Sequence, residues 1–344
     1  MLISEFNFDL PEELIAQNPL KKREDSRMLA VNRAEQNFRD ERFCNLSQFL
    51  KTGDVVVLNN TKVFPARLFG ATETGARVEL FLVREIENRM WETLSRPARR
   101  LKTGKKILFG ENLSAEVLEK TDEGRVIVRF EGNGDFNEIL ERIGQTPLPP
   151  YIKRDDGTSA EIDKSRYQTV FAKQRGAIAA PTAGLHFTPE ILEEIEDLGV
   201  SIAEITLHVG YGTFEPVRVS DLSEHRVMAE KYEISEEIAR LLNKAKSENR
   251  RIIAVGTTTT RTLESAADEQ GNISAGSRFA DLTITPDYKF RIIDGLLTNF
   301  HLPQSSLLVL VSTFAGYELT MKAYRHAVES GYRFYSYGDC MLII

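Results

Sequence analysis

The sequence is poor in cysteine and in long apolar runs, and each shortage excludes a class of protein. It contains only Cys44 and Cys340 among 344 residues. Two cysteines cannot form a disulfide framework or a four-cysteine zinc site, so a reduced, cytoplasmic setting is expected. Apolar runs such as Leu307–Val311 are far shorter than the roughly 20 residues that span a bilayer. The first residues include Glu5 and Asp9 and do not resemble a secretory signal. No membrane role is therefore expected.

Positive charge is not in excess either. The formal net charge of -7 argues against a chain that binds nucleic acid over its whole surface, because such binding needs many phosphate contacts. The run Arg96–Lys106 is a local exception, with six basic residues and no acidic one. The shorter cluster Lys21–Arg23 is a second exception. Taken alone, each cluster is interpreted most simply as a solvated surface segment.

The hydrophobic pattern predicts two kinds of architecture. Residues 67–130 show short alternating runs between turn signals, which indicates a small antiparallel β-barrel. The strands predicted there are Val78–Val83, Met90–Leu94, Lys106–Phe109, Leu113–Leu118 and Arg125–Phe130.

On either side of this region, strands alternate with amphipathic helices, which is typical of an α/β layer architecture. The strands predicted there are Asp54–Leu58, Ser201–Leu207 and Arg251–Val255, and the helices are Thr188–Leu198, Ser235–Glu248, Arg261–Glu269 and Glu318–Ser330. The predicted fold class is therefore α/β. A large mixed α/β domain, residues 1–63 plus 150–344, carries an inserted small antiparallel β-barrel domain, residues 64–149.

Three of the five histidines lie in segments that end or begin an element. His186 belongs to the string Pro-Thr-Ala-Gly-Leu-His-Phe-Thr188, directly before a predicted helix start with Thr188 as N-cap. His208 precedes Gly210 and Gly212, which would let the backbone approach a ligand. His301 lies between Asn299 and Pro303, a few residues after Asp294. Loops at element ends often carry catalytic groups, although each histidine could equally be a satisfied structural residue.

The segment Gly256–Arg261, Gly-Thr-Thr-Thr-Thr-Arg, follows a predicted strand and leads into a predicted helix. Its backbone amides would favour a carboxylate or phosphate, although threonines at a helix start are often only caps. The segment is neither a Walker loop nor a dinucleotide fingerprint. No histidine pair has helical zinc spacing and no Gly-X-Ser-X-Gly elbow occurs, so no metal site and no serine hydrolase are expected. Pattern alone thus indicates acid–base chemistry on a polar, partly anionic ligand.

The chain resembles the S-adenosylmethionine:tRNA ribosyltransferase-isomerase family of queuosine biosynthesis along its whole length. The matching segments are Phe8–Gln17, Asn59–Leu68, Pro147–Ile152, Arg166–Val170, Ala179–Thr188, Thr206–Gly210, Gly212–Phe214, Val255–Thr258, Thr298–Pro303 and Tyr332–Asp339. One position departs from the family. The family pattern is His-X-Met-His-X-Glu, whereas His225–Glu230 has Met228 in place of the second histidine.

The resemblance implies a reaction in which the ribosyl part of S-adenosylmethionine is transferred to a 7-aminomethyl-7-deazaguanine at the tRNA wobble position and isomerised. Epoxyqueuosine-tRNA, adenine and methionine would be the products. S-adenosylmethionine would be consumed as a co-substrate, with no other cofactor, and a monomer is expected. An S-adenosylmethionine-dependent RNA methyltransferase and a non-catalytic RNA-binding protein are the alternatives. The methyltransferase would give S-adenosylhomocysteine, and the RNA-binding protein would give no small-molecule product.

The resemblance also implies site residues. The catalytic candidates are His186, His208, Asp294 and His301, with His186 and His208 in the two proton-transfer roles. The candidates for binding S-adenosylmethionine are Thr182, Gly210, Thr213, Glu230, Thr257, Thr258, Arg261 and Asp339. The candidates for binding tRNA are Asn59, Lys62, Arg67, Arg96, Arg99, Arg100 and Lys102.

Overall fold

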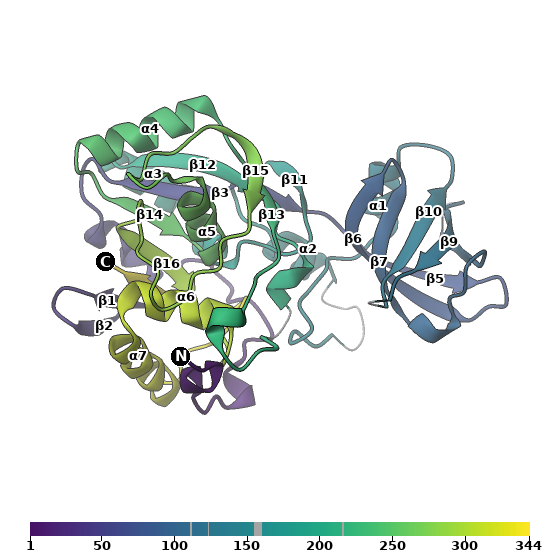
Figure 1. Cartoon of the computed structure of the whole chain (residues 1–344), viewed down its shortest axis with the longest axis horizontal. Helices are drawn as coiled ribbons and strands as arrows, with labels where there is room; N and C mark the ends of the chain where they lie inside the picture. Colours follow the sequence, from purple (N-terminus) through teal and green to yellow (C-terminus); the bar gives the residue numbers. More distant parts are fainter. Residues whose placement is uncertain (111, 123, 155–159, 215–216) are drawn as a thin grey trace.

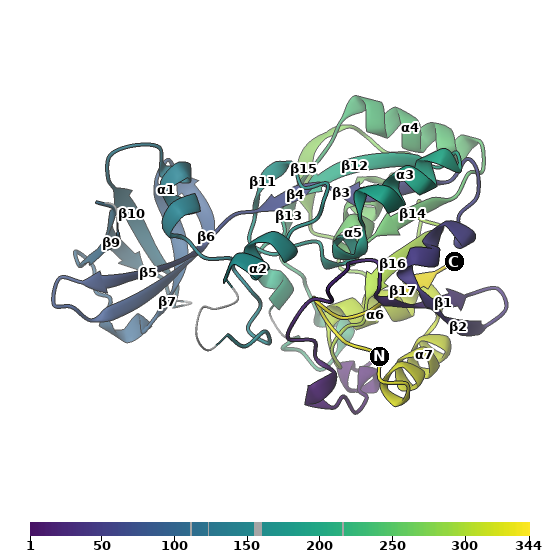
Figure 2. The same cartoon turned by 180° about the vertical axis from the view of Figure 1, so that it is seen from behind.

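A mixed β-sheet covered by helices forms the larger part of the molecule, and a small closed barrel stands apart from it (Figures 1 and 2). The computed structural model describes residues 1–110, 112–122, 124–154, 160–214 and 217–344, apart from the side chains of Arg100, Thr213 and Phe214. Both chain ends lie in the larger part. The structure thus has the predicted fold class, a large α/β unit with an inserted antiparallel barrel.

The large sheet has nine strands in the described part of the chain, in the order β15-β13-β12-β3-β14-β16-β17-β1-β2. Its central strands β12, β3, β14 and β16 are parallel, and antiparallel pairs adjoin them on both sides. The strands are β1 Arg27–Asn32, β2 Asn37–Arg42, β3 Val55–Asn59, β12 Ser201–Leu207, β13 Glu230–Ile234, β14 Ile252–Val255, β15 Gly276–Ala280, β16 Gly295–Asn299 and β17 Cys340–Ile343. The predicted strands correspond to β3, β12 and β14.

Both faces of the central part of this sheet are buried, because alternate side chains of strands such as β3 enter different cores. In β3, Val55 and Val57 pack in the larger core, whereas Val56 and Leu58 pack in a second core on the other face. The first face is covered by α4 Glu236–Ser247, α5 Thr257–Ala266, α6 Ser306–Ala315 and α7 Tyr317–Glu329. The second face is covered by α3 Pro189–Asp197 and the 3-10 helix Phe43–Phe49.

Side chains cap helices α3 and α4 as the sequence predicts. Thr188 accepts a hydrogen bond from the Ile191 amide at the start of α3, and Ser235 does the same for α4. Helix α5 begins at Thr257, four residues before the predicted start, and α6 was not predicted at all. Two further helices, α1 Phe136–Ile143 and α2 Ala160–Arg166, also lie outside the predicted set.

The small unit is a closed barrel in the strand order β10-β7-β6-β5-β8-β9. Its strands are β5 Arg67–Thr72, β6 Arg77–Glu87, β7 Met90–Arg96, β8 Lys106–Leu108, β9 Ser114–Lys120 and β10 Val126–Glu131. Their inward side chains form a separate core together with Phe136, Ile139 and Leu140 of α1. All of these elements fall within the predicted segment 64–149.

The two ends of the barrel segment are hydrogen-bonded to each other. The Arg67 amide donates to the Gln145 carbonyl at 3.2 Å, and the Gln145 amide donates to the Arg67 carbonyl at 2.8 Å. Just outside the barrel, β4 Thr61–Val63 pairs in parallel with β11 Gln174–Ala177. The chain therefore leaves the large unit and returns to it at one place (Figure 2).

Candidate functional site

A cavity opens where the parallel strands of the large sheet end. Strands β14 and β16 finish at Val255 and Asn299, and the residues that follow them line two adjoining hollows of about 170 and 60 Å³. Thr257, Thr258, Leu307 and Tyr335 line both hollows, so the two form one site. Ligands of open α/β sheets bind at this carboxyl edge, which makes the cavity the candidate functional site.

Helix α5 begins inside the site without a side-chain cap. Gly256 occupies the N-cap position with φ +95°, a backbone conformation that favours glycine, and it brings no side chain to bond the first amides. Thr257 and Thr258 are only 6% and 8% exposed, yet both line the hollows. Their neighbours Thr259 and Thr260 instead donate their hydroxyls to the carbonyls four residues back. The start of α5 thus presents backbone amides and two threonines to the cavity.

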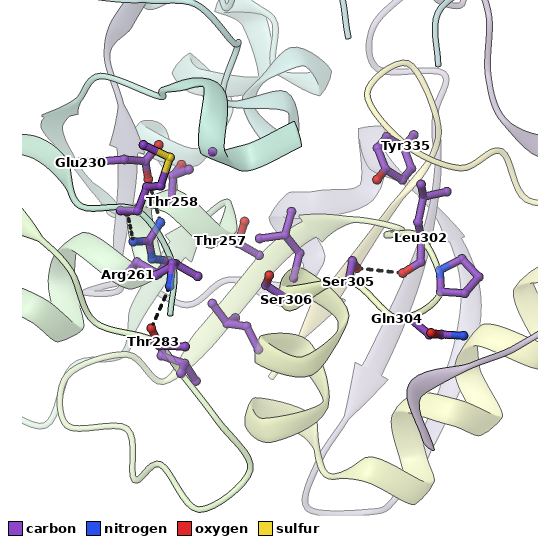
Figure 3. A pocket seen from close by; sticks show the side chains of 17 residues that line it. Glu230, Thr257, Thr258, Arg261, Thr283, Leu302, Gln304, Ser305, Ser306 and Tyr335 are labelled. Atoms are coloured by element: carbon purple, nitrogen blue, oxygen red, sulfur yellow. Dashed lines mark hydrogen bonds and ion pairs between the residues drawn. The ribbon is translucent and has the colours of Figure 1, made fainter. Parts of the chain in front are cut away.

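A second helix start faces the same hollow. Ser305 caps α6 by accepting a hydrogen bond from the Leu308 amide, and Ser305, Ser306 and Leu307 line the larger hollow (Figure 3). The Ser306 hydroxyl is 2.9 Å from Nε2 of His225. Each helix start carries a partial positive charge, so two of them at one cavity favour a bound carboxylate or phosphate.

One buried ion pair forms a wall of the larger hollow. Glu230 accepts from Arg261 at 2.7 Å and from the Gly210 amide at 2.9 Å, and the side chains of Glu230 and Arg261 are 6% and 9% exposed. Arg261 also donates to the carbonyls of Met228, Ala280 and Leu282. Most donors of Arg261 are therefore engaged within the protein, and its main part is to hold Glu230 and the surrounding loops in place.

His301 is the predicted histidine that lines the site. Its Nε2 is 2.9 Å from the Thr298 hydroxyl, and its backbone amide donates to the Tyr324 hydroxyl. His301 is buried, and this burial lowers its pKa to about 3. The imidazole is therefore neutral at physiological pH, so it acts there as a hydrogen-bonding group without charge.

His186 and His208 lie outside the residues that line the two hollows. His186 is 3% exposed, and its Nδ1 is 2.9 Å from the Ser26 hydroxyl. Burial lowers the pKa of His186 to about 4, an effect that the Asn299 side chain partly opposes. Nδ1 of His208 is 2.8 Å from the Thr61 hydroxyl, and burial together with Lys231 lowers its pKa. Neither ring therefore lines the cavity; each is hydrogen-bonded to a hydroxyl group of the protein.

The two aspartates among the predicted site residues are engaged with backbone amides. Asp294 precedes β16 and accepts from the Ile252 amide at 2.9 Å, which places it at the amino edge of the sheet, opposite the cavity. Asp339 accepts from the amides of Arg27 and Arg333. Burial raises the pKa of Asp339, and these amide bonds act against that shift. The structure does not bring Asp294 to the site, and Asp339 fixes the loop that carries Tyr335.

The remaining predicted ligand-binding residues are Thr182, Gly210 and Thr213. Thr182 lines the smaller hollow, while Gly210 takes part through its amide bond to Glu230. Thr213 belongs to the 3-10 helix Tyr211–Phe214, but its side chain lies outside the described part of the structure. Met228, which stands at the family's histidine position, lines the larger hollow next to Gly212.

The predicted tRNA-binding residues are only partly accessible. Asn59 is 1% exposed, and its amide is bonded to the backbone of Leu207 and Thr61, so it is a structural residue and cannot contact RNA directly. Lys62 is exposed and lines a cleft of about 430 Å³ between the barrel and the large unit. Arg67 pairs with Glu79 at 2.6 Å.

The basic run lies on the barrel. Arg96, Arg99 and Lys102 are exposed there, whereas the Arg100 side chain is outside the described part. The barrel that carries this run stands apart from the large unit, at the other end of the molecule from α4 and α7 (Figure 1). The structure therefore leaves these three cations available to a partner.

Ser305, Ser306 and Tyr335 line the site but were not predicted from the sequence. Ser305 and Ser306 directly precede an apolar stretch, which is a possible helix-start signal, but that stretch has no polar face to reveal a helix. Tyr335 lies in a segment matching the family, with no pattern of its own. Among the described residues, no group of three histidine, cysteine, aspartate or glutamate side chains is arranged to hold a metal ion, and no helix there is long and apolar enough to cross a membrane.

Comparisons with known proteins agree on one family. Residues 3–343 match the model of the family described as queuosine biosynthesis protein. An S-adenosylmethionine:tRNA ribosyltransferase-isomerase from Syntrophotalea carbinolica is 50% identical over 346 residues, covering 100% of both chains. Another, from Caldanaerobacter subterraneus subsp. tengcongensis, is 51% identical and covers 99% of each. The crystal structure of S-adenosylmethionine tRNA ribosyltransferase from Thermotoga maritima is 35% identical, with a TM-score of 0.56 over 99% of this chain and 100% of that one.

Proposed function

Because the chain belongs to the queuosine biosynthesis family, we propose that it transfers the ribosyl part of S-adenosylmethionine to the aminomethyl group of a 7-deazaguanine at the tRNA wobble position and isomerises it. Adenine and methionine leave, and epoxyqueuosine remains in the tRNA. S-adenosylmethionine is consumed as a co-substrate, and the proposal needs no other cofactor. A single chain acting in the cytoplasm, where the tRNA is found, is the unit proposed.

The observation that carries this proposal is the pair of helix starts at one cavity. S-adenosylmethionine has a carboxylate at one end, and the starts of α5 and α6 form a site for an anion of that size. Thr257 and Thr258 add two hydroxyls at the same place. The carboxylate of the methionine part binds there in the proposal.

Glu230 supplies the negative charge that the other end of the methionine part requires. Its carboxylate lines the larger hollow beside Thr258 and is held by Arg261 (Figure 3). A carboxylate in that position suits a sulfonium or the hydroxyls of a ribose. Arg261, which was expected to meet the ligand carboxylate, keeps Glu230 in position instead.

The proton steps of the reaction need groups that touch the ligand. His301 is the candidate in the site, as a neutral imidazole that can donate or accept a hydrogen bond. His186 and His208 are positioning residues in the proposal, because their rings bond Ser26 and Thr61. Asp294 is left without a part in the chemistry.

The tRNA contacts are proposed to come from the barrel and from the cleft beside it. Arg96, Arg99 and Lys102 are exposed cations on a chain whose net charge is -7, so they form a local surface for a polyanion. Lys62 at the cleft is the candidate nearest to the large unit. Distant phosphate contacts would position the tRNA while the modified base enters the site.

The test is product analysis. The protein is incubated with S-adenosylmethionine and a tRNA carrying the aminomethyl base, and adenine, methionine and S-adenosylhomocysteine are separated by chromatography. Adenine and methionine released in equal amounts, only with this tRNA, are the expected result. S-adenosylhomocysteine with a methylated base would identify a methyltransferase. Bound tRNA with no small-molecule product would identify an RNA-binding protein, and a tRNA with guanine at the wobble position is the matched control.

A further inference from the structure

Tyr335 stands where the two hollows join, in a backbone conformation that few side chains adopt. Its φ is +74°, in the left-handed region that costs free energy for a residue other than glycine. Three hydrogen bonds hold it there. The Tyr335 amide donates to the Phe300 carbonyl at 3.1 Å, and the Tyr335 carbonyl accepts from the Asn299 side chain and the Gly338 amide, each at 2.9 Å. The surrounding structure therefore fixes the direction of this side chain.

A second aromatic residue supports the ring. The centroids of Tyr335 and Tyr151 are 3.9 Å apart at an interplanar angle of 72°, an edge-to-face contact. The Tyr151 hydroxyl is itself 2.5 Å from the Ser336 hydroxyl. Tyr151 comes from the segment that returns from the barrel, so two distant parts of the chain hold one ring. The ring is thus rigid before any ligand binds.

The surroundings of the ring suit a flat, weakly polar group. Tyr335 is the aromatic side chain that lines the larger hollow in the described part of the chain, and Leu302, Leu307 and Leu310 line the same hollow. The charged pair Glu230 and Arg261 lies on the opposite side of the hollow from Tyr335 (Figure 3). Ser305 and Gln304 lie on the same side as Tyr335, so the site has a charged side and an uncharged side on which the ring of Tyr335 is the aromatic group. S-adenosylmethionine has the same division, with a charged methionine part and a planar adenine.

We propose that Tyr335 is a substrate-positioning residue whose ring stacks on the adenine of S-adenosylmethionine. The inference rests on the proposed function, because it takes that molecule as the ligand. Because the Tyr335 ring is already held in place, binding adenine costs no further conformational entropy of that side chain. The stacked adenine then keeps one orientation, which aligns its bond to ribose for cleavage. The strained backbone of Tyr335 is the cost of that orientation.

The experiment measures adenine directly, so it does not depend on turnover. Equilibrium binding of free adenine and of free methionine is measured for the wild type, Tyr335→Phe and Tyr335→Leu. Stacking on an aromatic side chain contributes enough affinity that its removal should weaken adenine binding roughly 5- to 100-fold. Tyr335→Leu should show this loss with methionine binding unchanged, whereas Tyr335→Phe should bind adenine like the wild type. The KM for S-adenosylmethionine should rise in Tyr335→Leu more than kcat falls.

Two controls separate the ring from the fold. Tyr335→Asn removes the ring but accepts positive φ readily, so relief of backbone strain should offset part of the packing lost against Tyr151, and the variant should fold and still lose adenine affinity. Tyr317→Leu changes a half-buried tyrosine at the start of α7, away from the site, and should leave adenine binding unchanged. Wild-type adenine affinity in Tyr335→Leu, or an equal loss in Tyr335→Phe, would overturn the inference. A wild type that binds adenine through Tyr335 but releases none from S-adenosylmethionine would overturn the proposed function alone.

Discussion

At the scale of single residues, buried histidines make the protein sensitive to acid. His186 and His301 are neutral in the folded chain, since burial lowers the pKa of His186 to about 4 and that of His301 to about 3. An imidazole in an unfolded chain has a pKa of about 6.5. Between that value and the folded value, the unfolded chain binds protons that the folded chain does not. The two histidines therefore do not lower the free energy of unfolding above about pH 6.5, and they lower it progressively as the pH falls below that value.

We predict that His301→Gln loses less stability on acidification than the wild type. Glutamine can keep a hydrogen bond to Thr298 but takes up no proton. Between pH 7 and pH 5, the wild type should lose about 2 kcal/mol more than the variant, since each pKa unit corresponds to about 1.4 kcal/mol. Urea unfolding at the two pH values measures this difference. Carboxylates titrate in both proteins alike, so equal losses would mean that His301 is protonated in the folded chain.

At the scale of elements, the start of α5 separates binding threonines from structural ones. Thr258 lines the cavity, whereas the Thr259 hydroxyl donates to the Val255 carbonyl at 2.7 Å within the helix and its side chain is fully buried. Threonine and valine have nearly the same shape, so a valine variant removes the hydroxyl and little else. Valine at position 258 should therefore affect ligand binding, whereas valine at position 259 should affect stability.

We predict that Thr258→Val raises the KM for S-adenosylmethionine about 10-fold or more, because a hydrogen bond to a charged group is worth about 1.5–3 kcal/mol. Its unfolding midpoint should stay near that of the wild type. Thr259→Val should instead lose about 1 kcal/mol of stability and keep its KM. Steady-state kinetics and urea unfolding of both variants provide the comparison. An unchanged KM in Thr258→Val would show that the Thr258 hydroxyl does not bind the carboxylate of S-adenosylmethionine.

At the scale of the whole molecule, the barrel presents the exposed cations Arg96, Arg99 and Lys102 on a chain whose net charge is -7. We predict that replacing Arg96, Arg99 and Lys102 together by glutamine weakens tRNA binding and lowers its salt dependence. Each lost phosphate contact should reduce the slope of log affinity against log salt by roughly 0.7–0.9. The matched control replaces Arg240, Lys322 and Arg325, exposed cations on α4 and α7, and changes the net charge equally. If both triple variants keep the wild-type slope, the basic run is only a solvated surface.

The sequence was sufficient for five of the six barrel strands, for three central strands of the large sheet and for the capped helices α3 and α4, because their periodicity and caps are local signals; it missed β5. It missed α6, since a helix that is apolar on all sides has no amphipathic period. It started α5 late, because threonine has a low helix propensity and no side-chain cap marks the start of this helix.

The predicted site residues that line the two hollows are Thr182, Glu230, Thr257, Thr258, Arg261 and His301. Sequence reasoning could not separate Asp294 from this group. The five residues of β16 carry the chain from one edge of the sheet to the other, and nothing local shows which edge holds the ligand. His186 and Asn59 are buried, and this burial keeps their side chains from the roles that were predicted for them. The sequence could not show it, because burial arises from contacts between residues far apart in the chain.

The mutual hydrogen bonds of Arg67 and Gln145 hold the two ends of the barrel segment side by side. Such a segment can be inserted into a protein, or removed from it, as one piece. Inserting or removing it changes one connection of the large unit and leaves the strand order of the large sheet unchanged. A short connection between the two adjacent ends is therefore all that a chain without the barrel would need to keep the strand order of the large sheet.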